Sequence, residues 1–308
     1  MLLLKCNHFF KLQSFKTLQC QYLLGKKISS IKYHVILLNL YRTYAEYVTS
    51  GILLDEQLNC SYTDISCFRA ASYQQIAAAQ KVVNTLLKSL KILLIFFEPW
   101  VPTIDNLIVH GQAVDTIKNV SFPLKPLIIG TLTEEAVLYI YEDWHKPVYS
   151  TQYTEITVAT FNRRALKVLE RFPPVGTRDQ RLLLVSVGTH WMFACSTRVF
   201  ARKAATYTYV FGYPLDFDGW DNLTLCNDYV CHGSKLSYVF ESALVNFTDA
   251  GRQLTTNIVT SWTNFGKIHD PNQPVIPSLL WPKTLINSKQ HMYFQNPLQV
   301  QENYLKDD

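Results

Sequence analysis

The sequence predicts an α/β fold in which helices pack on a mostly parallel sheet. Two short runs rich in β-branched and aromatic residues, at 124–131 and 207–211, are typical of strands buried on both faces. Segments with helical spacing stand before and between these runs. Because strands alternate with helix-length segments, we expect parallel neighbouring strands rather than an all-helical fold or a β-sandwich.

The first helix with a clear start follows Ser72. Ser72 and Gln75 have the spacing of a capping box, and apolar residues then recur at helical spacing as far as Lys91. Prolines after Glu98 break regular structure, and residues 105–118 are predicted to form a loop with at most a short hairpin. Further helices are expected at 134–143, 154–170 and 177–206, separated by prolines.

The composition fits a packed globular core and excludes several classes of function. Hydrophobic residues make up 48% of the chain, and 29 basic against 24 acidic residues leave a net charge of +5 without a run of lysine or arginine. We therefore expect no nucleic-acid partner. No uncharged apolar run reaches about 18 residues, so no transmembrane segment is expected. We also expect no cofactor and no metal site, since the cysteine spacings do not suit zinc.

Cysteines and glycosylation acceptors point to the oxidising secretory route. The chain has seven cysteines, and we expect disulfides between Cys60 and Cys67 and between Cys226 and Cys231, because each pair lies in a short loop. Cys195 is expected to stay outside both. Four N-x-[ST] sequons predict glycosylation and a secreted or lumenal protein, at Asn59, Asn119, Asn222 and Asn246.

Residues 1–40 differ in character from the rest of the chain. They carry lysines without acids and show no clean period, so we treat them as a separate divergent or disordered segment before a domain at 41–308. Lys5 and Cys6 interrupt the apolar start, which argues against a signal peptide. A transit peptide or a replaced amino terminus are the alternatives.

Glu135 and His232 are the candidate catalytic residues. Glu135 lies just beyond the carboxyl end of the first predicted strand, where open α/β sheets place functional side chains. His232 lies in a loop and could transfer protons near neutral pH. Each residue also has an ordinary structural explanation. Glu135 could interact favourably with the dipole of the next helix, and His232 could have a purely structural role. Together they supply two of the three residues of a serine-hydrolase triad in the order serine, acid, histidine. No Gly-x-Ser-x-Gly elbow occurs anywhere in the sequence, so no nucleophile is assigned.

With these residues in place, the order of motifs resembles the second half of a type-B carboxylesterase, the family that includes the cholinesterases. The similarity covers about residues 41–308, roughly half of the family's usual length. It rests on several motifs in the family's order: Leu58-Asn-Cys-Ser and Ser66-Cys-Phe-Arg-Ala-Ala-Ser72, Pro99-Trp-Val-Pro-Thr-Ile-Asp105, Ile129-Gly-Thr-Leu-Thr-Glu-Glu135, Val230-Cys-His232-Gly-Ser-Lys-Leu-Ser-Tyr-Val-Phe240, Trp262-Thr-Asn-Phe-Gly266, Asp270-Pro-Asn272 and Trp281-Pro282.

The resemblance implies an incomplete α/β-hydrolase fold with one open sheet edge. It also implies that Glu135 is the catalytic acid and His232 the catalytic histidine, while Glu134 should face solvent or cap the following helix. Lys235 stands where the family usually has an acid, which reverses a charge near the site.

The family's serine and oxyanion-hole stretches have no counterpart in this sequence. The chain is therefore expected to be a carboxylic ester hydrolase fragment that is inactive alone, with an ester substrate only if a serine-bearing amino-terminal half is supplied. Assembly with a separately encoded half would provide one. The alternative is a non-catalytic, cholinesterase-like binding or adhesion protein.

Overall fold

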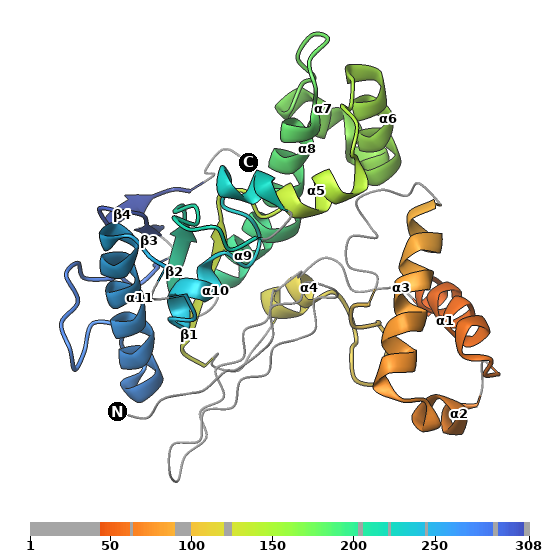
Figure 1. Cartoon of the computed structure of the whole chain (residues 1–308), viewed down its shortest axis with the longest axis horizontal. Helices are drawn as coiled ribbons and strands as arrows, with labels where there is room; N and C mark the ends of the chain where they lie inside the picture. Colours follow the sequence, from red (N-terminus) through yellow and green to blue (C-terminus); the bar gives the residue numbers. More distant parts are fainter. Residues whose placement is uncertain are drawn as a thin grey trace. The chain divides into compact units, whose positions relative to one another are not determined.

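The computed structural model describes residues 44–61, 64–89, 100–119, 125–202, 206–220, 223–243, 246–285 and 289–304 (Figure 1). The segment 1–40 and Asn222 lie outside these ranges. The chain divides into two compact units. One contains residues 121–138 and 189–308, and the other contains residues 37–120 and 139–188.

A four-stranded sheet forms the centre of the first unit. Its strands lie in the order β1 (Leu127–Leu132), β2 (Thr206–Phe211), β3 (Gln290–Phe294) and β4 (Gln299–Glu302). The pairs β1/β2 and β2/β3 are parallel, and β3/β4 is antiparallel. The two strands expected to be parallel neighbours are therefore confirmed. Within the described residues β1 pairs with β2 alone, so the outer edge of β1 carries no partner strand there.

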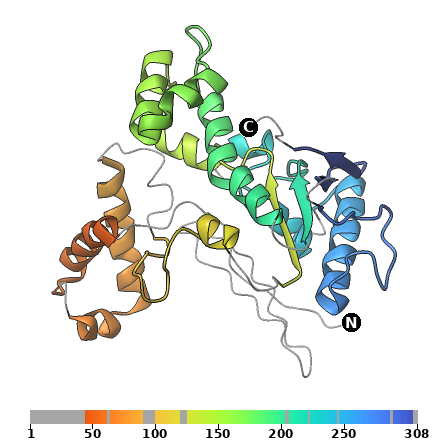
Figure 2. The ribbon, with the colours of Figure 1, turned by 180° about the vertical axis from the view of Figure 1, so that it is seen from behind.

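Helices cover the two faces of this sheet. Figures 1 and 2 show the sheet between α9 (Cys195–Ala201) and α11 (Asp249–Ile268). On the α11 face, Tyr209, Trp262 and Trp281 pack their rings edge to face or tilted, with centroids 5.2 to 6.2 Å apart. Tyr207, two residues earlier in β2, also packs against Trp281, with centroids 6.1 Å apart, so aromatic side chains at alternate positions of β2 contribute to the core on that face.

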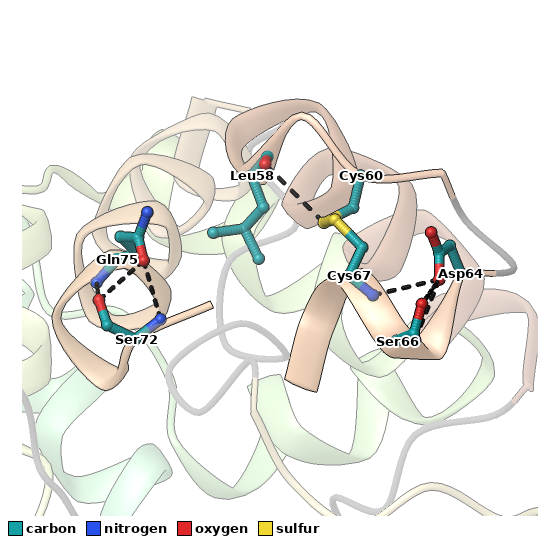
Figure 3. Close-up of a disulfide and its surroundings, with 7 residues drawn as sticks. All are labelled: Leu58, Cys60, Asp64, Ser66, Cys67, Ser72 and Gln75. Carbon is teal, nitrogen blue, oxygen red and sulfur yellow. Dashed lines mark hydrogen bonds between the residues drawn. A yellow bond between two sulfur atoms is a disulfide. The ribbon is translucent and has the colours of Figure 1, made fainter. Parts of the chain in front are cut away.

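The second unit is helical in the part that the structure describes. Its elements are α1 (Tyr44–Leu58), α2 (Ile65–Ala70), α3 (Tyr73–Ser89), α4 (Ala113–Lys118), α6 (Ser150–Phe161), the 3₁₀ turn η1 (Asn162–Arg164), α7 (Ala165–Arg171) and α8 (Arg181–Gly188). Helix α5 (Val137–Asp143) leads into it from the sheet. As expected, α3 begins with a capping box, in which Ser72 N donates to Gln75 Oε1 at 2.8 Å and Gln75 N donates to Ser72 Oγ at 3.3 Å (Figure 3).

The predicted helices differ from the observed ones in four places. The helix expected at 134–143 begins only at Val137. Residues 105–118 were expected to be loop, but Val114 and Ile117 are buried on one side of α4. The helix expected at 154–170 begins earlier, at Ser150, and is broken at Asn162, whose backbone takes a positive φ of 47°. The helix expected at 177–206 begins later, at Arg181, and contains a π-helical turn, η2 (Thr189–Ala194).

Both expected disulfides are present. Cys60 and Cys67 join the end of α1 to α2, with a Cα separation of 5.8 Å (Figure 3). Cys226 and Cys231 close a shorter loop in the other unit, with a Cα separation of 5.6 Å. Cys195, at the start of α9, belongs to neither. Among the described helices, none has both the length and the apolar character needed to cross a membrane.

Candidate active site

Glu135 is buried at the carboxyl end of β1. Its side chain is folded back on the strand, where Oε1 accepts hydrogen bonds from Leu132 N at 2.9 Å and from Thr131 Oγ1 at 3.3 Å. Only 3% of the residue is exposed. These bonds fix one carboxylate oxygen, and they leave Oε2 pointing at the histidine described next.

His232 reaches Glu135 from a loop that follows β2. The disulfide between Cys226 and Cys231 constrains this loop, and Gly233 takes a positive φ of 89° where the chain turns into α10 (Lys235–Val239). His232 is 5% exposed, and its Nδ1 forms a short hydrogen bond with Glu135 Oε2. The expected convergence of these two residues, 97 positions apart in the sequence, is confirmed.

Electrostatics favour a charged Glu135. Burial raises the pKa of its carboxyl, but the facing His232, the charge of Lys235 and the Leu132 amide together bring that pKa below its ordinary value. Burial in turn lowers the pKa of the half-buried Lys235, and the attraction of Glu135 partly offsets this. The carboxylate is therefore the negative centre of a site that also holds a lysine.

The π-helical turn η2 contacts His232 and the residue that follows Glu135. Thr189 Oγ1 accepts a hydrogen bond from Ala136 N at 3.2 Å, directly after Glu135. Phe193, from the same turn, packs against the His232 ring with centroids 5.4 Å apart. A π-helical turn widens the helix by one residue, and such turns are frequent at functional sites. Sequence periodicity did not reveal it.

Glu134 behaves differently from the expectation. Its side chain is only partly exposed, and the contact with α5 is made by its backbone carbonyl, which accepts a hydrogen bond from Val137 N at 3.1 Å. Instead Glu134 Oε2 accepts hydrogen bonds from Val230 N at 3.0 Å and from Thr133 Oγ1 at 2.8 Å. The prediction was wrong because the histidine loop returns to this end of β1, and its buried amide needs an acceptor.

The remaining predicted site residues lie elsewhere. Cys60 and Cys67 belong to the other compact unit, together with the sequon residues Asn59 and Asn119, while Asn246 lies before α11. All three of these asparagines are exposed. In the part of the chain that the structure describes, no cluster of three or more histidine, cysteine or acidic side chains is arranged to hold a metal ion.

Comparison with known proteins identifies the family. The model of the carboxylesterase family matches residues 49–308. The chain belongs to the carboxylesterase family. Glu135 and His232 both lie inside the matched region of this carboxylesterase-family chain.

Relatives of this carboxylesterase-family chain include two proteins of Dictyostelium discoideum. The chain is 26% identical over 259 residues to the cAMP-regulated D2 protein, covering 81% of this chain and 48% of that protein. It is 28% identical to the Crystal protein over 228 residues, covering 71% of this chain and 41% of that protein. Acetylcholinesterase 1 of Caenorhabditis elegans is 23% identical over 232 residues, which cover 63% of this chain and 36% of that protein. The chain thus spans about half the length, or less, of these relatives.

Solved structures show the same fold. A structure titled PNB esterase superposes with a TM-score of 0.68 over 87% of this chain and 54% of that chain, at 15% identity. A thermophilic PNB esterase gives a TM-score of 0.67 at 16% identity. These likenesses establish an α/β fold that matches about half of an esterase chain.

Proposed function

We propose that this chain supplies the acid and the histidine of a serine-dependent carboxylic ester hydrolase. The observation that carries the proposal is the buried hydrogen bond between Glu135 Oε2 and His232 Nδ1 at the carboxyl ends of parallel strands. In α/β-hydrolases the acid precedes the histidine in sequence and holds the imidazole in one tautomer. Family membership and the order of the two residues support these roles.

The geometry defines what each residue would do in ester cleavage. Glu135 holds Nδ1, so proton transfer would run through Nε2 of His232. As a serine oxygen bonds to the ester carbonyl carbon, Nε2 would take the hydroxyl proton, and the buried carboxylate would stabilise the imidazolium that forms. The same proton would then pass to the departing alkoxide, which leaves as the alcohol when the carbonyl re-forms.

The 308 residues contain no Gly-x-Ser-x-Gly elbow to provide that serine. Removing the nucleophile from such a triad lowers kcat by about 10⁶-fold. We therefore expect the chain alone to be inactive, and we expect activity only when a serine-bearing amino-terminal part completes the site.

A chimera tests the roles of Glu135 and His232. The amino-terminal part of the cAMP-regulated D2 protein that lies outside the match would be joined to residues 49–308, with hydrolysis of a short-chain aryl ester as the readout. We expect hydrolysis that falls by at least about 10³-fold in His232→Ala. Hydrolysis by the chimera that survives His232→Ala would contradict the proposal.

The chain alone provides the complementary test. It should release no more product from the aryl ester than its own His232→Ala variant, and a fluorophosphonate should label no serine. Ester hydrolysis that His232→Ala abolishes would reveal a nucleophile within these residues. That result would overturn the expected inactivity but support the role of His232.

A non-catalytic binding role is the second candidate, and Lys235 favours it. The charge of this half-buried lysine, together with the facing His232, lowers the pKa of the Glu135 carboxyl, and it stands where the family usually has an acid. A folded chimera that neither hydrolyses the ester nor reacts with a fluorophosphonate would support this alternative. Gain of both reactions on Lys235→Glu would assign the loss to this lysine.

We further infer that the protein folds in the secretory route. The two disulfides support this placement, because such bonds persist in oxidising compartments. The exposed Asn59, Asn119 and Asn246 would then be available to glycosylation. The test is to express the protein in a eukaryotic cell with a secretion signal and to treat it with an amidase that removes N-linked glycans. We expect the treated protein to migrate faster on a denaturing gel. Unchanged migration would argue against glycosylation at these asparagines.

A further inference from the structure

We propose that Glu134 is a positioning residue that holds the loop of His232 in register with Glu135. This inference deepens the proposed function and rests on it. It rests on the hydrogen bond by which the Val230 amide joins the histidine loop to Glu134 at the end of β1.

Adjacent carboxylates hold the same loop at different points. Glu135 bonds the imidazole of His232, whereas Glu134 bonds the backbone amide of Val230, which lies two residues earlier. His232 lies 97 residues after Glu135, and Val230 lies 96 residues after Glu134. One attachment alone would allow the loop to pivot about it. The second attachment fixes where the main chain enters the turn that carries the imidazole.

The Val230 amide has a strong need for an acceptor. Val230 is 4% exposed, and a buried N–H without a partner carries the full penalty of its lost hydration. Glu134 Oε2 satisfies this donor at 3.0 Å. The Thr133 hydroxyl donates to the same oxygen at 2.8 Å, which fixes the orientation of the carboxylate.

Other bonds keep the loop folded when this contact is removed. The disulfide between Cys226 and Cys231 closes the loop, and Cys231 N donates to Tyr229 O at 3.0 Å. Ser234 N also donates to Cys231 O at 3.0 Å. Removing the Glu134 carboxylate should therefore shift the loop as a body instead of unfolding it, and the imidazole would lose its fixed place against Glu135.

Nuclear magnetic resonance of the full chain tests this inference without any need for ester hydrolysis. The proton on His232 Nδ1 in a short bond to a carboxylate gives a far-downfield resonance, which disappears when the ring becomes mobile. Hydrogen exchange of the Val230 amide reports the anchoring bond directly. The variants are Glu134→Ala, Glu134→Gln and, as a matched control in α6, the exposed Glu155→Ala.

We expect Glu134→Ala to abolish the downfield resonance and to speed exchange at Val230 about tenfold, the equivalent of one lost hydrogen bond. Glu134→Gln should retain both signatures, because its amide oxygen can accept the same N–H. Glu155→Ala should change neither. Thermal unfolding of each variant separates a positioning role from a general loss of stability.

Two results would overturn the inference. A Glu134→Ala chain with lowered thermal stability but an undiminished downfield resonance would show that Glu134 only stabilises the fold. Absence of the resonance in the unsubstituted chain would overturn the acid and histidine pairing of the proposed function as well. The two failures are therefore distinguishable.

Discussion

Glu135 holds the imidazole of His232 in a buried hydrogen bond that spans 97 residues of sequence. Both residues belong to one compact unit, Glu135 just after β1 and His232 in the loop before α10. The pair forms within a chain whose sequence contains no serine elbow. Hydrogen bonds from Leu132 and Thr131 hold the Glu135 carboxylate, and a bond from Val230 to Glu134 holds the histidine loop. The geometry of the pair therefore needs no nucleophile.

Glu135→Gln should destabilise the chain in a pH-dependent way. At neutral pH we expect the free energy of unfolding to fall by about 1.5 to 3 kcal/mol, the contribution of a hydrogen bond to a charged group. The unfolded-state pKa of Glu135 is about 4.5, and its folded-state pKa lies below that value. Its contribution is therefore present above that value and is lost as the pH falls through the folded-state pKa. Denaturant titrations across this range should show the two chains converging in acid, and a constant difference would contradict the account.

His232→Ala should cost more than Glu135→Gln. The substitution leaves the buried Glu135 carboxylate without its imidazole partner. Breaking a buried pair in this way typically lowers the free energy of unfolding by about 3 to 5 kcal/mol. The double variant should therefore be more stable than the sum of the single effects implies. Additive single effects in chemical denaturation would show that the two side chains do not interact.

Gly130→Ala should destabilise the sheet beside the site. A Cβ at Gly130 would collide with the side chain and the carbonyl oxygen of Tyr209 on the neighbouring strand. Overpacking of this kind costs about 1 to 3 kcal/mol. Gly111→Ala is the matched control, because no atom lies within 4 Å of a Cβ placed there. Equal unfolding free energies for the two variants would contradict the close approach of β1 and β2.

Replacing both Cys226 and Cys231 by alanine should lower the free energy of unfolding by about 2 kcal/mol, since the closed loop is short. It should also broaden the His232 resonances, because the disulfide constrains the loop that ends at this histidine. The matching double replacement of Cys60 and Cys67, in the other compact unit, should leave those resonances unchanged. Identical His232 spectra for both variants would count against a role for this disulfide in the site.

Some of these features could be predicted from the sequence and others could not. The short apolar runs predict the strands β1 and β2. The spacing of Ser72 and Gln75 predicts the start of α3, where the capping box is present. The pairing of Glu135 with His232 followed from motif order in the family. In contrast, α4 was missed although Val114 and Ile117 have helical spacing, because six residues give too little periodicity and Gln112 makes no side-chain cap.

The role of Glu134 could not be read from its own surroundings. Its acceptor function depends on where the Val230 amide returns after 96 residues, which is a property of the whole sheet. The π-helical turn at Thr189–Ala194 was hidden for a similar reason, since its partners, Ala136 and His232, belong to distant segments. Tertiary contacts decided both features.

The tautomer of His232 in the unsubstituted chain tests the central claim most directly. Long-range proton–nitrogen correlation spectra distinguish an imidazole that is protonated on Nδ1 from one protonated on Nε2. Because Glu135 Oε2 accepts from Nδ1, we expect the neutral ring to carry its proton on Nδ1, with an unprotonated Nε2. A neutral ring protonated on Nε2, with a spectrum unaltered by Glu135→Gln, would contradict the pairing on which the proposed function depends.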